Sequence, residues 1–139
     1  MYAFDDEPNF HSFAAALRAG NPDAALAFNP GSMGQIKRIS DEEDYTAGEF
    51  DNSLILGNWW PWANQKMPSH VDGARTQVFT FLGEWWGKSP PRFPDELARG
   101  YTEFVNQYGG SMMWDVPISS DGCIPPEFLK QLQFIGRKV

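Results

Sequence analysis

The sequence predicts an α/β fold with parallel strands and flanking helices, as in part of a (β/α) barrel. Three strand-like runs, residues 24–28, 76–82 and 111–118, alternate with stretches that carry apolar residues at helical spacing. This alternation implies a parallel sheet with right-handed crossovers. The connections that enter the strands are short, whereas those that leave them are long, polar and aromatic. Such asymmetry is typical of a (β/α) barrel, whose working face lies at the C-terminal ends of the strands.

The first half of the chain predicts one helix and one strand before a long connection. Apolar residues recur at helical spacing from about residue 9 to 19, and Gly20 can end that helix. Residues 24–28 follow as a short buried strand. From 32 to 75 the pattern is irregular apart from one short extended piece at 54–56. A connection this long in a compact domain is usually functional.

The second half repeats a strand–helix order. The Asp72-Gly73 turn leads into the strand at 76–82, and a helix begins at Pro94 or Asp95. The face of that helix that is expected to pack carries Leu97, Tyr101, Phe104, Val105 and Tyr108. After the strand at 111–118, a last helix opens at 125–127, and its apolar stripe is Phe128, Leu129, Leu132 and Ile135.

The length of 139 residues is enough for one domain, residues 1–139, with a real core. A closed (β/α)8 barrel takes about 250 residues, and three parallel strands leave two open edges. The chain is therefore either a small open α/β layer or the C-terminal portion of a TIM barrel, and we predict the second half of such a barrel.

Charge and composition exclude several function classes. A net charge of −7 argues against nucleic acid, because phosphate binding needs a basic face. No basic amphipathic stretch predicts a membrane surface, and no run approaches the ~20 apolar residues of a spanning helix. The start of the chain lacks the features of a signal peptide, which predicts the cytoplasm for the chain as it stands. A longer parent protein could still be secreted or periplasmic.

Metal and cofactor sites are not predicted. Cys123 is the single cysteine, so neither an intrachain disulfide nor a cysteine-based zinc site is expected. His11 and His70 do not have metal-ligand spacing. His11 is expected at the surface of a helix, and His70 in a structural role before a turn. Residues 31–34 lack the lysine of a phosphate loop.

Six tryptophans stand beside acids at turns, a combination that suits a pyranose-binding site. They fall at 59–62, 85–86 and 114. The plain alternative is that half of them plug the rim of a barrel. The residues that we predict to line a sugar site are Asn29, Trp59, Trp60, Glu84, Trp85, Trp86, Trp114 and Asp115.

The polar members of that set each have a second interpretation. Asp115 could bind sugar hydroxyls or fix a loop by accepting backbone N–H groups. Glu84 follows a strand directly, which favours a substrate contact over a salt bridge. For Asn29, satisfying the turn at Pro30 is favoured over binding substrate. Glu49 ends an acidic stretch that begins at Asp41: it is either a general acid or a capping residue.

Several segments together resemble the C-terminal half of the barrel in α-L-fucosidase-like proteins of glycoside hydrolase family 29. The order and spacing of these segments carry the resemblance over most of the chain, from about Phe10 to Ile135. The segments are 20–23 with 27–31, 44–49, 81–87 with 91–93, and 109–110 with 114–118.

The resemblance implies a retaining exo-glycosidase barrel whose nucleophile is an aspartate on a strand preceding Met1. It makes Glu49 the candidate general acid/base, and a retaining mechanism needs the partner carboxylate about 5–5.5 Å away. The chain is then a glycosidase fragment with a carbohydrate substrate and no cofactor, unable to cleave alone. Two alternatives remain open. One is a non-catalytic carbohydrate-binding module, and the other is a half-barrel that forms a homodimer or pairs with a missing N-terminal half.

Overall fold

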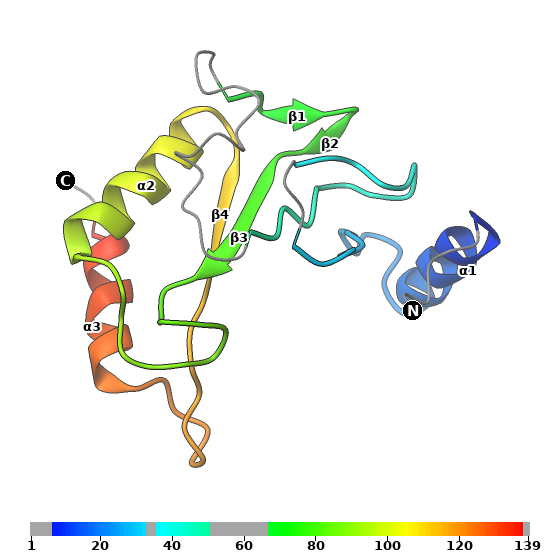
Figure 1. Cartoon of the computed structure of the whole chain (residues 1–139). Helices are drawn as coiled ribbons and strands as arrows, with labels where there is room; N and C mark the ends of the chain where they lie inside the picture. The colour runs from blue at the N-terminus through cyan, green and yellow to red at the C-terminus, as the bar shows by residue number, and fades with distance from the viewer. Residues whose placement is uncertain (1–6, 33–35, 51–66, 138–139) are drawn as a thin grey trace.

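The computed structural model describes residues 7–32, 36–50 and 67–137, with side chains from Asn9 onward. The predicted extended piece at 54–56 lies outside these residues. The elements are α1 (Glu7–Arg18), β1 (His70–Val71), β2 (Ala74–Arg75), β3 (Gln77–Phe81), α2 (Asp95–Gln107), β4 (Ser111–Asp115) and α3 (Pro126–Ile135). Figure 1 shows them as an extended arc, with α1 at one end and the α2–α3 layer at the other.

The strands form one parallel and one antiparallel pair. β3 and β4 are parallel, with Gln77 beside Ser111 and Phe81 beside Asp115. β1 and β2 form a short antiparallel hairpin. The prediction of parallel strands with flanking helices is therefore confirmed for β3 and β4, the sheets are mixed, and no closed barrel is present in the described residues.

The segment 44–50 runs beside β3, inside what the sequence predicted to be an irregular connection. Parallel bridges join Tyr45 to Arg75 and Glu49 to Phe79. Between these bridges, the Thr46 hydroxyl donates to the carbonyl of Gln77 and accepts from its N–H group, at 3.2 and 3.0 Å. One side chain thus replaces a pair of ladder hydrogen bonds, and 44–50 acts as a third parallel strand.

Residues 24–28 were predicted as a strand, and the structure corrects this. The backbone carbonyl of Leu26 accepts from the Asp44 N–H group, which anchors the segment beside 44–50. However, the N–H groups of Leu26 and Phe28 donate to the carboxylates of Asp44 and Glu43, both at 2.8 Å. Acidic side chains satisfy donors that a neighbouring strand would otherwise satisfy, so no regular ladder forms.

The helices begin and end close to the predicted residues, but their packed faces differ in part. α2 buries Ala98, Tyr101 and Val105, whereas Leu97 is 41% exposed. α3 buries Phe128 and Gln131, whereas Leu129 is 46% exposed. The amide of Gln131 donates to the carbonyl of Phe93 at 2.7 Å, which explains how a polar group belongs to this core.

α2 and α3 cover one face of the β3–β4 pair (Figure 1). Val78 and Met112 pack with Tyr101 and Val105 of α2, among others. Leu82 and Trp114 belong to a second cluster with Ala98 and Phe128. Because side chains alternate along a strand, the odd-numbered residues of β3 and β4 point to the opposite face.

Candidate functional site

The register of the extended segments places a row of side chains on the face that α2 and α3 do not cover. Glu49 stands beside Phe79, which in turn stands beside Met113. Two residues further along, Phe81 stands beside Asp115. These residues lie near the C-terminal ends of their segments, and we call them the inner row.

Glu49 is held at the inner row by two donors from the preceding connection. Its Oε2 accepts from the Asn29 side-chain amide at 2.5 Å, and its Oε1 from the Ser32 hydroxyl at 2.9 Å. Asn29 also accepts the N–H group of Gly31, so it fills the predicted turn role as well. Ser32 was not predicted. It became recognisable only once Asn29 and Glu49 were brought together across 20 residues of sequence.

Gly48 sets the position of Glu49. Its φ is +61°, in the left-handed region. A Cβ atom built there would lie 1.8 Å from the carbonyl oxygen of Gln77. Glycine alone permits this close approach of the two backbones, and the approach sets Glu49 beside Phe79.

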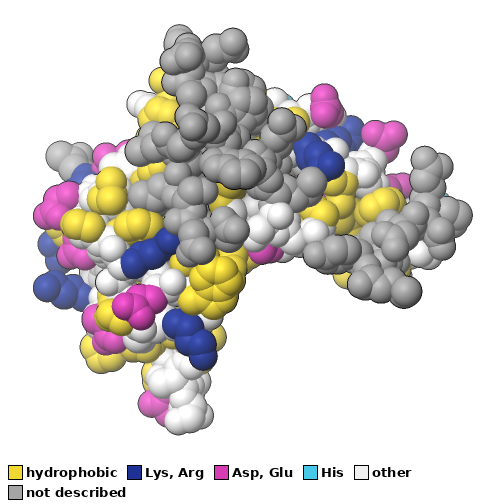
Figure 2. All heavy atoms as spheres, in the orientation of Figure 1, with side chains coloured by type: hydrophobic (Ala, Val, Ile, Leu, Met, Phe, Trp, Pro, Cys, Tyr) yellow, Lys and Arg dark blue, Asp and Glu magenta, His cyan; other side chains and the backbone are white. Residues whose placement is uncertain are grey.

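An aromatic shelf adjoins Phe79 and Phe81, formed by the loop after β3. The Trp86 ring lies 4.8 Å from Phe79 and 4.9 Å from Phe81, centroid to centroid. The Trp85 ring lies 5.3 Å from Phe81 and is 45% exposed. Figure 2 shows a hydrophobic patch at the surface near this end of β3. The predicted Trp85 and Trp86 thus come together with the inner row.

The shelf rests on a tightly folded loop. Gly83 bridges to Pro91, and a Cβ atom at Gly83 would lie 1.7 Å from the Lys88 carbonyl oxygen. The Arg92 guanidinium lies over the Phe81 ring at 3.9 Å and donates to the Phe81 carbonyl at 3.0 Å. Cation–π and hydrogen-bond contacts therefore fix the underside of Phe81.

The remaining predicted residues divide between the two faces. The Asp115 carboxylate accepts the Gly87 N–H group at 2.6 Å, so it ties the shelf loop to β4. Glu84 is exposed beside Trp85. Trp114 points to the helix face, where its indole N–H donates to the Thr102 hydroxyl at 2.9 Å. Trp59 and Trp60 lie outside the described residues.

The acidic stretch before Glu49 is structural. Glu43 is 4% exposed, and its carboxylate accepts the N–H groups of Phe28, Ile39 and Ser40. Glu42 pairs with His11 at 2.8 Å and with Arg18 at 3.4 Å. The buried carboxylate of Glu43 therefore organises the loop. His11, as expected, is at the surface.

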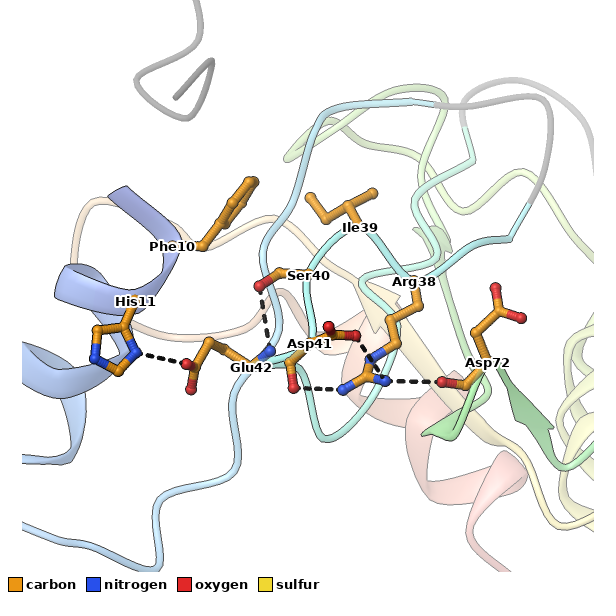
Figure 3. Close-up of a pocket in the computed structure, with 8 residues that line it drawn as sticks. All are labelled: Phe10, His11, Arg38, Ile39, Ser40, Asp41, Glu42 and Asp72. Carbon is orange, nitrogen blue, oxygen red and sulfur yellow. Dashed lines mark hydrogen bonds and ion pairs between the residues drawn. The ribbon is translucent and has the colours of Figure 1, made fainter. Parts of the chain in front are cut away.

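A separate hollow lies between α1 and the turn at 38–42 (Figure 3). Its volume is about 520 Å³, and Phe10 and Ile39 form its apolar side. Arg38 at the hollow is already engaged: it donates to the backbone carbonyl of Asp72 at 2.9 Å and pairs with the Asp41 carboxylate. The hollow adjoins the start of the extended segments, away from Glu49. None of the residues predicted to line the sugar site lines it.

Asp121 lies in the turn after β4. Its carboxylate accepts the Cys123 N–H group at 3.0 Å, and this bond, with one from Ser119, lowers the pKa of the Asp121 carboxyl. This effect stabilises a turn and contributes nothing to the inner row.

The described residues offer neither a metal site nor a membrane span. No group of three or more histidine, cysteine, aspartate or glutamate residues among them is placed to hold a metal ion. No helix within the same residues is long and apolar enough to cross a bilayer.

Solved structures with a similar fold are glycoside hydrolases. The endo-fucoidan hydrolase MfFcnA9 of glycoside hydrolase family 107 superposes with a TM-score of 0.70 at 19% identity. The match covers 97% of this chain and 28% of that one. MfFcnA4, of the same family, gives 0.69 at 19% identity, over 94% of this chain and 23% of that one. The chain has the fold of a part of these glycoside hydrolases.

The comparison supports the predicted resemblance only at the level of glycoside hydrolases in general. The similar structures belong to family 107, whereas the motifs resembled family 29, so the support extends to glycoside hydrolases and not to one family. The chain spans about a quarter of the length of these enzymes. No family model and no curated protein sequence matches it.

Proposed function

We propose that the chain supplies one wall of a sugar-binding site in a glycoside hydrolase-like protein. One observation carries the proposal: separate segments bring the Asn29–Glu49 pair and the Trp85–Trp86 shelf to one face, at the ends of adjacent parallel segments. An indole offers a flat apolar surface to a pyranose ring, while a carboxylate and an amide bind its hydroxyl groups.

The surroundings of Glu49 support a role in proton transfer. Asn29 Nδ2 can only donate, so Glu49 Oε2 remains an acceptor. The Ser32 hydroxyl can rotate to donate or to accept. It can therefore hydrogen-bond to Glu49 Oε1 whether or not that oxygen carries a proton. Glu49 is therefore our candidate general acid/base, with the proton exchanged at Oε1.

Asp115 is a poor candidate for the second catalytic carboxylate. It is separated from Glu49 by β3, and two strand spacings amount to about 10 Å. A retaining pair requires about 5–5.5 Å between carboxyl groups. Asp115 is also engaged with the Gly87 N–H group. We therefore propose that the nucleophile comes from outside this chain, and that this chain alone binds sugar without cleaving it.

The proposed ligand is a fucose-containing glycan. The motif resemblance to α-L-fucosidase-like proteins supports this choice, and so does the similarity in fold to enzymes named for fucoidan hydrolysis. The test is isothermal titration calorimetry with an L-fucose oligosaccharide. Trp85→Ala should weaken binding about tenfold, the equivalent of ~1.4 kcal/mol of lost stacking. Leu129→Ala, which removes a similarly exposed apolar side chain from α3, is the control and should change nothing.

A non-catalytic carbohydrate-binding module is the second candidate function. The exposed position of Trp85 favours this function, since an exposed indole ring can stack on a sugar. Sugar binding alone also needs no second carboxylate. Incubation with an aryl α-L-fucoside tests what both candidates share, which is that this chain alone does not cleave the sugar. Robust turnover by this chain that Glu49→Gln abolishes would place a complete active site within it. Such turnover would contradict both the absent nucleophile and the binding module.

A further inference from the structure

We infer that Met113 makes the inner row selective for a 6-deoxy sugar, in which C5 carries a methyl group in place of the hydroxymethyl group of a hexose. This selectivity rests on the proposed function, because it concerns the same sugar-binding wall. It gives a role to the end of the inner row that lies furthest from Glu49.

The inner row has a polar end and an apolar end. Glu49 and Met113 stand on either side of Phe79 in the register of the neighbouring segments. Two strand spacings separate them, about 10 Å, which leaves room for one pyranose ring over Phe79. Asn29 and Ser32 add further polar groups at the Glu49 end.

Met113 supplies the apolar end. Its side chain is 44% exposed, so a ligand on this face can reach it. The nearest polar side chains of β4 on that face belong to Ser111 and Asp115, each about 7 Å away along the strand. The Asp115 carboxylate already accepts the Gly87 N–H group. A thioether is flexible and polarisable, and its sulfur is only a weak hydrogen-bond acceptor. The Met113 end therefore suits a methyl group better than a hydroxyl group.

A 6-deoxy pyranose has the matching asymmetry. Its methyl group is on C5, whereas the hydroxyl groups on C2 and C3 leave the ring from the opposite side. With those hydroxyl groups at Glu49 and Asn29, the methyl group lies towards Met113. L-Fucose is such a sugar, and L-galactose differs from it only by a hydroxyl group on C6. Bound in the same way, L-galactose would place that hydroxyl group beside Met113, where it loses hydrogen bonds to water.

The partial exposure of Met113 sets the size of the selectivity. An enclosed apolar pocket discriminates against an added hydroxyl group by about a hundredfold. Because water still reaches part of the Met113 side chain, some hydration of the hydroxyl group is kept. We therefore expect a preference for L-fucose of about tenfold.

The test is isothermal titration calorimetry of the full chain with two oligosaccharides of equal length and linkage. One is built from L-fucose and the other from L-galactose, and the first should bind about tenfold tighter. Met113→Gln introduces an amide that can bind the C6 hydroxyl group, and it should bring the two affinities within about twofold of each other. Met113→Leu keeps an apolar side chain and should keep the preference.

Leu129→Gln is the matched control. It makes the same kind of change at a residue that is 46% exposed, on the helix α3 that packs against the other face of the β3–β4 pair. Both affinities should stay unchanged. Circular dichroism identifies any variant that fails to fold. If Met113→Gln does so, Met113→Thr replaces it, because threonine is also polar and suits a strand.

The outcomes separate this selectivity from the proposed function. Equal or tighter binding of the L-galactose ligand overturns the selectivity while the proposed function stands, because sugar still binds. A preference that Met113→Gln leaves intact, or that Met113→Leu or Leu129→Gln abolishes, overturns it in the same way. Binding of neither oligosaccharide contradicts the proposed function, and the selectivity with it.

Discussion

Thr46 shows how one hydroxyl group holds the candidate catalytic residue in place. It bonds to both the N–H group and the carbonyl of Gln77, and it is completely buried. The segment that ends in Glu49 is joined to β3 through this side chain and through the bridges on either side of it. The position of Glu49 therefore depends on a polar contact three residues before it.

Replacing Thr46 with valine should destabilise the protein by about 2–6 kcal/mol. Valine keeps the shape but leaves a buried donor and acceptor of Gln77 unsatisfied, at about 1–3 kcal/mol for each group. Thr46→Ser is the control: it keeps the hydroxyl and loses one methyl group, at about 1 kcal/mol. Urea denaturation of both variants measures the difference. Equal losses would show that the methyl group, and not the hydroxyl, is what matters.

The residue scale also shows what sequence reasoning could not reach. Glu49 was a candidate because it ends an acidic stretch, but nothing in the pattern indicated that Asn29 and Ser32 would hold it. Trp114 differs: it was predicted at the sugar site together with Asp115, although adjacent residues of a strand point to opposite faces. Its contact with Thr102 on the helix side follows from that alternation.

At the scale of elements, the shelf depends on the loop between β3 and α2. Gly83 lies against the Lys88 backbone, and the Asp115 carboxylate accepts from Gly87 within the same loop. The two glycines differ in their surroundings. Gly83 has no room for a side chain, whereas a Cβ atom at Gly87 would meet nothing within 4 Å.

Gly83→Ala should therefore displace the loop and abolish sugar binding, with a stability loss of roughly 3 kcal/mol. Gly87→Ala is the matched control. It adds the same methyl group at a φ of +61°, and the strained backbone should cost only about 1 kcal/mol. Thermal unfolding and calorimetric titration of both variants measure the effects. If Gly83→Ala bound sugar normally, the shelf would not depend on the closeness of this packing.

The elements that sequence patterns predicted best are those with continuous apolar runs. β3 and β4 were recognised in this way, and their parallel pairing followed from the helix between them. The segment 44–50 was missed because Thr46 and Gly48 interrupt the apolar pattern at the points where the two backbones meet. The strand predicted at 24–28 was wrong because Glu43 and Asp44 satisfy its N–H groups.

At the scale of the whole molecule, the described residues include both the inner row with its shelf and the hollow beside α1, and only the inner row with its shelf is proposed to bind sugar. The inner row and the aromatic shelf together combine a positioned carboxylate with an exposed indole. The hollow beside α1 is also lined by polar and aromatic groups, but His11 and Glu42, and Arg38 and Asp41, are already paired with each other. A test of the proposed function therefore has to locate the bound sugar as well as detect it.

The most direct measurement is an NMR titration of the ¹⁵N-labelled chain with an L-fucose oligosaccharide, read at the indole N–H signals. The proposal predicts that the signals of Trp85 and Trp86 shift with the Gly87 amide, because they lie at the shelf. The Trp114 indole, which donates to Thr102 on the opposite face, should stay unchanged. Shifts confined to residues around the hollow, such as His11 and Ser40, would contradict the proposed site, and so would no shifts at all.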